Sequence, residues 1–84
     1  MYIEFKGKKY RVKRVEGFSF DDIVSINGIT GIVDFIGSDK IMIVDETDVK
    51  LFIPISEITE VYLLAAFSPD PGSPFVLNSD EQQH

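Results

Sequence analysis

The chain of 84 residues has no cysteine and no tryptophan, and its single histidine is the last residue, His84. Without cysteine there is no disulfide framework, as is typical of proteins in a reducing compartment. The longest apolar run, from Val61 to Phe67, has seven residues, whereas a membrane-spanning helix needs about 20. The first residues also lack the charged and then apolar order of a signal peptide. We therefore expect a cytoplasmic protein without membrane contact.

The side chains that catalysis uses most often are missing or isolated. Because His84 is terminal, no serine has a histidine partner inside the fold, and a Ser-His-Asp arrangement is not available. Gly28 and Gly31 fall within a predicted hairpin, where they cannot form a phosphate-binding loop between a strand and a helix. The adjacent Asp21 and Asp22 point to opposite faces of a strand. We expect no enzyme, no catalytic residue, no cofactor and no small-molecule substrate.

A metal site is also not expected. The acidic turn at 45–48 lacks the ligand spacing and the central glycine of a calcium loop. Aspartate favours such turns for local reasons, so a solvated turn is the simpler interpretation.

Positive charge is confined to one end of this acidic chain, whose net charge is −6. Residues 1–15 carry +5, because one acid, Glu4, accompanies six of the eight cations: Lys6, Lys8, Lys9, Arg11, Lys13 and Arg14. The other 69 residues contain two lysines and 13 acids, which is −11. A separation of this kind indicates either a charged partner or docking between the two parts of the chain.

Alternating apolar and polar residues predict short strands along most of the chain. Residues 1–15 alternate on both sides of Gly7-Lys8, which predicts an N-terminal hairpin. Asn27-Gly28 supplies the two positive-φ positions of a type I′ turn, and this turn pairs Ile26 with Ile29. That register predicts one buried face: Val24, Ile26, Ile29, Val33 and Phe35.

Two further turns set the next strands. A two-residue loop at Ser38-Asp39 pairs Phe35 with Met42 and Val33 with Val44, and the turn at 45–48 then pairs Val44 with Val49. Met42 and Val44 are thus expected in the core, although a three-residue loop at Gly37 would place Ile41 and Ile43 there. In the first register a second face carries surplus apolar residues: Ile32, Ile36, Ile41, Ile43 and Phe52.

The end of the ordered part is marked by proline. Pro54 cannot donate to a sheet ladder, so a strand should end there and a 3₁₀ turn should follow near 54–57. A last strand should then run to about Leu63. Three prolines between 68 and 74 and a polar end predict a disordered tail over 68–84, apart from an apolar island at 75–77. We expect one β-barrel domain over 1–67.

This order of motifs resembles the SH3-like small barrels, including KOW-type domains. The resemblance covers residues 18–63 and includes Asp22-x-Val24, Gly28-Ile-Thr-Gly31-x-Val33 and the exit through Pro54, Ile58 and Val61. It implies an all-β fold, a barrel of about five strands preceded by the hairpin. Because many unrelated functions use such folds, it names no function.

Three functions fit these features. The leading one is a non-enzymatic module that binds a protein partner, either another protein or a second copy of the chain. Its expected contact residues are the aromatic side chains near the barrel ends: Phe18, Phe20, Phe52, Tyr62 and Phe67. The second is nucleic-acid or ribosome binding through the six N-terminal cations, which interleave with Tyr2, Phe5 and Tyr10. The third is an acidic inhibitor that imitates nucleic acid through carboxylates on the barrel: Asp34, Asp39, Asp45, Glu46, Asp48, Glu57 and Glu60.

Overall fold

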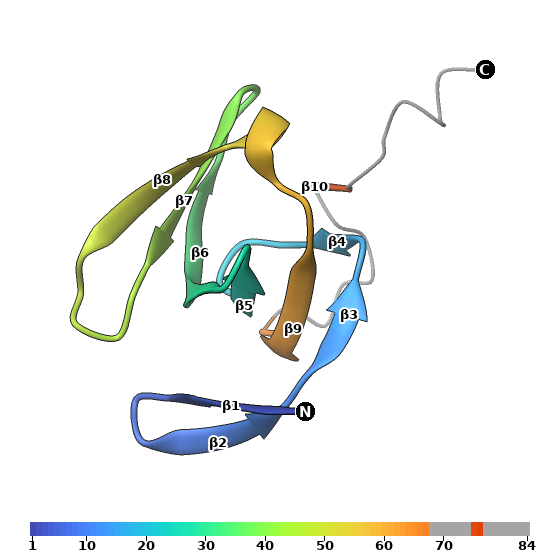
Figure 1. The fold of residues 1–84 in the computed structure, drawn as a ribbon. Helices are drawn as coiled ribbons and strands as arrows, with labels where there is room; N and C mark the ends of the chain where they lie inside the picture. Colours follow the sequence, from blue (N-terminus) through green and yellow to red (C-terminus); the bar gives the residue numbers. More distant parts are fainter. Residues whose placement is uncertain (68–74, 77–84) are drawn as a thin grey trace.

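The computed structural model describes residues 1–67 and 75–76, and these residues form an all-β chain (Figure 1). The elements are β1 (Tyr2–Phe5), β2 (Lys8–Arg11), β3 (Lys13–Val15), β4 (Gly17–Phe18), β5 (Ile23–Ile26), β6 (Ile29–Ile36), β7 (Lys40–Val44), β8 (Lys50–Pro54), the 3₁₀ helix η1 (Ile55–Glu57), β9 (Val61–Ala65) and β10 (Phe75–Val76). The predicted all-β class, N-terminal hairpin and 3₁₀ turn are confirmed.

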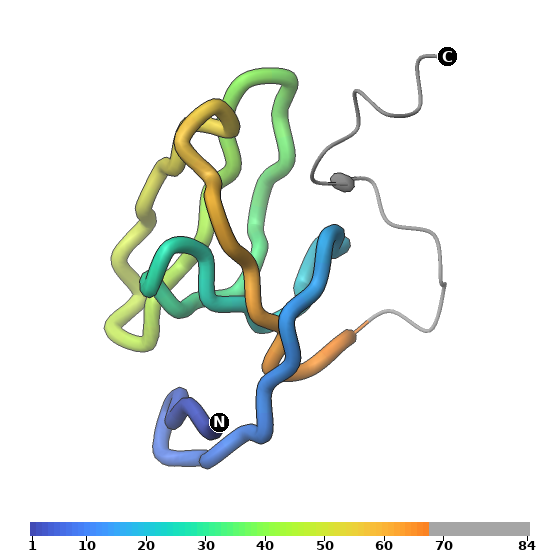
Figure 2. The backbone as a smooth tube through the Cα atoms, turned by 45° about the vertical axis from the view of Figure 1, so that its right-hand side comes forward, coloured from blue at the N-terminus to red at the C-terminus, as the bar shows by residue number. Residues whose placement is uncertain are grey.

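Six strands form one antiparallel sheet in the order β3-β9-β5-β6-β7-β8, and the pairs β1-β2 and β4-β10 are separate. The sheet curls around the core, as the ribbon and the backbone tube both show (Figures 1 and 2). Within the described residues its edge strands β3 and β8 do not pair with each other, so hydrogen bonds do not close it into a barrel.

The predicted hairpin over 1–15 divides into two parts. Residues 2–11 form the hairpin β1-β2, whereas β3 leaves it and becomes the edge strand beside β9. The tight turn is at Lys6-Gly7, where φ is 52° and 78°, one residue before the predicted Gly7-Lys8. Two consecutive positive-φ residues are the geometry of a type I′ turn.

The Asn27-Gly28 turn forms as predicted, with Ile26 opposite Ile29 and Val24 opposite Gly31. The φ angles of Asn27 and Gly28 are 52° and 85°. The Asn27 side chain has a second role that its sequence position does not reveal. Its Nδ2 donates to the Glu57 carbonyl oxygen at 2.7 Å, and its Oδ1 accepts from the Thr59 N–H at 2.9 Å. The turn is therefore fastened to the segment that joins η1 to β9.

The predicted side-chain directions on β6 and β7 are partly wrong because β6 contains an irregularity at Asp34. Phe35 faces Met42 as predicted, but Val33 faces Ile43 instead of Val44, so the register shifts between Val33 and Phe35. A bulge of this kind reverses the side-chain alternation on one side of it. Phe35 is consequently exposed, and Ile41 and Ile43 are buried where Met42 and Val44 were expected.

The bulge explains why the predicted loop was right and the predicted core was wrong. Gly37 N–H donates to the Lys40 carbonyl at 2.9 Å, which leaves the two-residue loop Ser38-Asp39 between them. Ile29, predicted in the core, is also partly exposed, since it lies at the end of its strand beside the turn.

The β7-β8 turn is one residue longer than predicted. Asp45 N–H donates to the Val49 carbonyl, Asp48 has a φ of 66°, and residues 45–49 separate the paired residues Val44 and Lys50. Val44 therefore faces Lys50, not Val49, and Met42 faces Phe52.

The core lies inside the curled sheet. Its buried members are Phe18, Val24, Ile26, Val33, Ile41, Ile43, Ile53, Ile58 and Val61. One carboxylate, Asp22, is buried nearby and accepts from the Ser19 N–H at 2.9 Å and the Phe67 N–H at 3.0 Å. It thereby joins the loop before β5 to the end of β9.

Residues 75–76 belong to the apolar island that was excepted from the predicted disordered tail, and they pair as β10 with β4. The rest of that prediction, for 68–74 and 77–84, lies outside the described residues. Among the residues that are described, no helix has the length and apolarity to cross a membrane.

Candidate functional site

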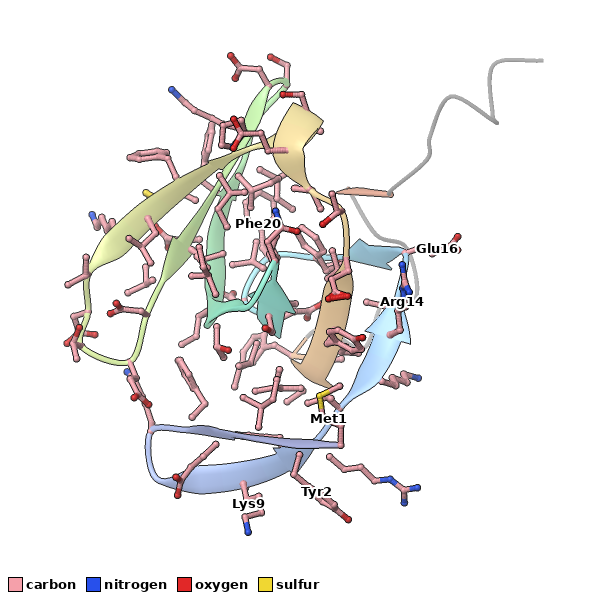
Figure 3. All side chains as sticks on the ribbon, viewed as in Figure 1. Met1, Tyr2, Lys9, Arg14, Glu16 and Phe20 are labelled. Atoms are coloured by element: carbon pink, nitrogen blue, oxygen red, sulfur yellow. The ribbon has the colours of Figure 1, made fainter. Side chains whose placement is uncertain are left out.

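The hairpin β1-β2 has one face toward the sheet and one toward solvent. Ile3 and Tyr10 are opposed and half-buried, and Phe5 on the same face is buried. Tyr2 and Lys9 are exposed on the other face, and Figure 3 shows both side chains pointing away from the sheet. This amphipathic arrangement follows from the alternation of a strand.

Polar contacts hold the tip of the hairpin against the β7-β8 turn. The Lys6 backbone N–H donates to Glu46 Oε1 at 3.0 Å, and Lys6 Nζ lies 3.7 Å from Asp48 Oδ1. At the base, the Val12 N–H donates to the Met1 carbonyl at 3.0 Å. The hairpin is thus fixed at both ends, and Phe5 anchors it between them.

The six N-terminal cations remain in solvent. Every one of them has an exposed residue surface: Lys6, Lys8, Lys9, Arg11, Lys13 and Arg14. Within residues 1–67 and 75–76, the Lys6–Asp48 contact is the one ion pair within 4 Å. The predicted alternative, in which these charges are neutralised against the acidic sheet, therefore applies to Lys6 alone.

The cations fall into two groups. Lys6, Lys8, Lys9 and Arg11 belong to the hairpin, whereas Lys13 and Arg14 are on β3. Figure 3 shows Arg14 at the outer edge of β3, well away from Lys9. The Lys8 ammonium lies 5.4 Å from the centre of the Tyr10 ring, within cation–π range. The hairpin is the denser group. Lys9 and Arg11 share its solvent face with Tyr2, whereas Lys8, opposite Phe5, lies with Tyr10 on the face toward the sheet.

The predicted protein-contact residues do not form one surface. Phe18 is 2% exposed and belongs to the core, because β4 directs its ring inward, so its ring does not face a partner in this structure. Tyr62 is half-buried beside Met1 and Ile3 of the hairpin. Phe52 is exposed on β8.

Of the five predicted contact residues, Phe20 and Phe67 are the two whose backbones the structure brings close together. The Asp22 carboxylate accepts from the N–H of Ser19, the residue before Phe20, and from the N–H of Phe67. The exposed fractions of Phe20 and Phe67 are 46% and 73%. They form a candidate apolar contact at the end of β9.

One row of outward side chains was only partly predicted: Phe52 was expected to point away from the core, whereas Phe35 and Met42 were expected inside it. Phe35, Met42 and Phe52 are directly opposed on three adjacent strands and form a row across β6, β7 and β8. Phe35 is 44% exposed and Phe52 is 59% exposed. The signal in the sequence was the pairing of Phe35 with Met42, but it was assigned to the core because the bulge at Asp34 was not foreseen.

The acidic side chains are spread over several turns. Asp39 lies before β7, whereas Asp45 and Asp48 follow its other end. Asp45 Oδ1 accepts from the Thr47 N–H at 2.8 Å and the Val49 N–H at 3.0 Å. These bonds, led by the one from Val49, lower the pKa of the Asp45 carboxyl. The Asp45 carboxylate thus stabilises its own turn.

Two open recesses separate the hairpin from the sheet. The larger, about 440 Å³, has a mixed polar and apolar lining: Glu4, Phe5, Gly28, Ile29, Thr30, Asp45, Glu46, Thr47 and Leu51. Over the described part of the chain, no group of three histidine, cysteine or acidic side chains is arranged to hold a metal ion.

Comparison with known proteins adds no relative, since no family model, curated protein or solved structure matches the chain. The function is therefore argued from the surfaces described above.

Proposed function

We propose that this protein is a non-enzymatic, SH3-like β module that binds nucleic acid through the solvent face of its N-terminal hairpin. The observation that carries the proposal is the exposure of all six N-terminal cations, of which Lys6 alone pairs with a carboxylate within the described residues. The hairpin docks through Ile3 and Phe5, so the docking does not consume its charge.

The physical basis is electrostatic. Lysine and arginine that contact phosphates release condensed counterions, and this release supplies most of the sequence-independent affinity for nucleic acid. Tyr2 lies opposite Arg11 on the same face and offers a ring on which a base can stack. The acidic side chains on the turns of the sheet repel the phosphate backbone, which leaves the hairpin as the favourable side of approach.

The test uses charge substitutions on and off this face. Glu4, the one acid on the hairpin, lies opposite Lys9 and is exposed. Glu4→Lys should therefore increase affinity for a single-stranded oligonucleotide, whereas Lys9→Glu with Arg11→Glu should abolish it. Glu57→Lys makes the same charge change on η1, away from the hairpin, and is the matched control. Equal gains for Glu4→Lys and Glu57→Lys would refute a local site.

A second function, binding of a protein partner, is favoured by the exposed Phe20 and Phe67. Large exposed rings are typical of the centres of protein interfaces. Replacing both by serine should remove a partner captured by the full chain, whereas Val49→Ser, also at an exposed apolar position, should not. Capture that survives the double replacement would reject this surface.

A further inference from the structure

The outer face of β6, β7 and β8 carries a row of apolar side chains that stay partly in solvent within the described part of the chain. Phe35, Met42 and Phe52 face one another directly across the three strands. Two phenyl rings with about half of their surface in solvent are unusual on a domain this small, because burial of each ring would be favourable.

Lysines border this row. Lys40 Nζ lies 5.3 Å from the centre of the Phe52 ring, and Lys50 lies two residues before Phe52, so its side chain is on the same face. Both are exposed, and they are the only two cations after residue 15. Among strands β5 to β9, the positive charge is thus confined to the aromatic row.

The Phe35 ring is held by the shape of the neighbouring turn. A Cβ atom on Gly37 would stand 2.7 Å from Cε2 of this ring, so the ring occupies the space that a side chain would need. The row is therefore a surface with a defined position, set by the bulge at Asp34 on one side and Gly37 on the other.

We infer that this row is a base-stacking platform for single-stranded nucleic acid, with Phe35 and Phe52 as the stacking rings and Lys40 and Lys50 as phosphate contacts. Exposed aromatic rings on a sheet face, flanked by cations, are the arrangement with which proteins bind unpaired bases. The inference rests on the proposed function and adds that the ligand is single-stranded.

The hairpin and the row are close enough for one strand to reach both. Lys6 at the hairpin tip contacts Asp48, which precedes Lys50 by two residues. Two residues span at most about 7 Å, and Phe52 is another two residues along the extended strand. A strand of about 4 to 16 nucleotides, which is the length that one OB-type β domain covers, is long enough for this path. Asp34 is exposed at the bulge, where its negative charge repels a phosphate, so Asp34→Asn should strengthen binding.

The experiment uses the absence of tryptophan from the natural chain. In the full-length variant Phe52→Trp, addition of a twelve-residue oligothymidine should quench the single tryptophan, and Phe67→Trp should show no quenching. Phe35→Ala and Phe52→Ala should each weaken binding about 5- to 150-fold, whereas Phe67→Ala should not. Binding of a duplex of the same length should not change in any of these variants.

Phe52→Leu separates stacking from apolar docking, and it also guards against a variant that fails to fold. The affinity of Phe52→Leu for oligothymidine should fall as much as that of Phe52→Ala, because leucine has no aromatic face. If the oligonucleotide binds through the hairpin but Phe52→Trp is not quenched, the platform is refuted and the proposed function stands. If the natural chain binds no oligonucleotide, both are refuted. A protein partner lost with Phe52→Ala and kept with Phe52→Leu would also overturn the platform.

Discussion

Asn27 is expected to stabilise the fold in two separable ways, through its backbone conformation and through its side chain. Its φ of 52° lies in the left-handed region, which most residues occupy at a cost of about 1–2 kcal/mol and asparagine and glycine occupy more readily. Its side chain links the β5-β6 turn to Glu57 and Thr59, which are 30 and 32 residues away in the sequence.

Asn27→Gly keeps the backbone conformation and removes the side-chain bonds. Three of these are 3.0 Å or shorter: from Nδ2 to the Glu57 carbonyl, and from the Thr59 N–H and Oγ1 to Oδ1. Each is worth about 0.5–1.5 kcal/mol, and solvent exposure favours the lower end. We expect a loss of about 2 kcal/mol in the free energy of unfolding.

Asn27→Ala removes the same bonds and adds the cost of a positive φ. It should therefore be about 1 kcal/mol less stable than Asn27→Gly. The matched control is Asp48→Gly, at another residue with positive φ (66°) whose side chain contacts only exposed Lys6, at 3.7 Å. That change should alter stability by less than about 1 kcal/mol, because exposed ion pairs contribute little.

The assay is urea unfolding followed by far-ultraviolet dichroism. With a slope of about 1 kcal/mol per molar urea, the Asn27→Gly midpoint should fall by about 2 M at an unchanged slope. If Asn27→Gly unfolds at the natural midpoint, the side-chain link contributes nothing. If Asn27→Gly and Asn27→Ala have the same midpoint, the backbone argument fails.

Three other changes test the fold. Gly31→Ala should cost at least about 1–3 kcal/mol in urea unfolding, because its Cβ would stand 2.6 Å from a backbone carbonyl of β7, whereas Gly37→Ala should cost less because it meets a movable ring. Asp22→Ala should lose about 2–4 kcal/mol, since two backbone N–H groups lose a charged acceptor, and a loss below 1 kcal/mol would contradict this role. The Asp45 pKa is lowered by folding, so its contribution is present above the ordinary aspartate pKa of about 3.9 and is lost as pH falls through the lower folded-state value. Asp45→Asn should therefore flatten the fall in stability between pH 5 and pH 2, and an unchanged pH profile would exclude this contribution.

The strands and their turns were largely predictable because local chemistry determines them. Asn27-Gly28 specifies a type I′ turn whatever surrounds it, and Pro54 ends a strand because it lacks an N–H. The link from the Asn27 side chain to Thr59 could not be predicted, since it depends on where a distant segment passes.

Side-chain directions were less predictable, because one extra residue reverses them. Nothing in the sequence marks Asp34 as the bulge, and without it the alternation places Phe35 inside and Ile41 outside. The candidate surfaces likewise divide into one that the local sequence reveals and one that depends on how the strands pair. The basic hairpin was visible in the local charge pattern, whereas the row that contains Phe35 and Phe52 required the three-dimensional register.

The salt dependence of oligonucleotide binding tests the central claim most directly. If the hairpin cations bind phosphates, the logarithm of the affinity for a twelve-residue oligothymidine should fall linearly with the logarithm of salt concentration. With about three to six contacts the slope should be about −2 to −4, and it should be shallower in Lys9→Gln by about 0.7. A slope near zero, or one that Lys9→Gln leaves unchanged, would contradict binding through this face.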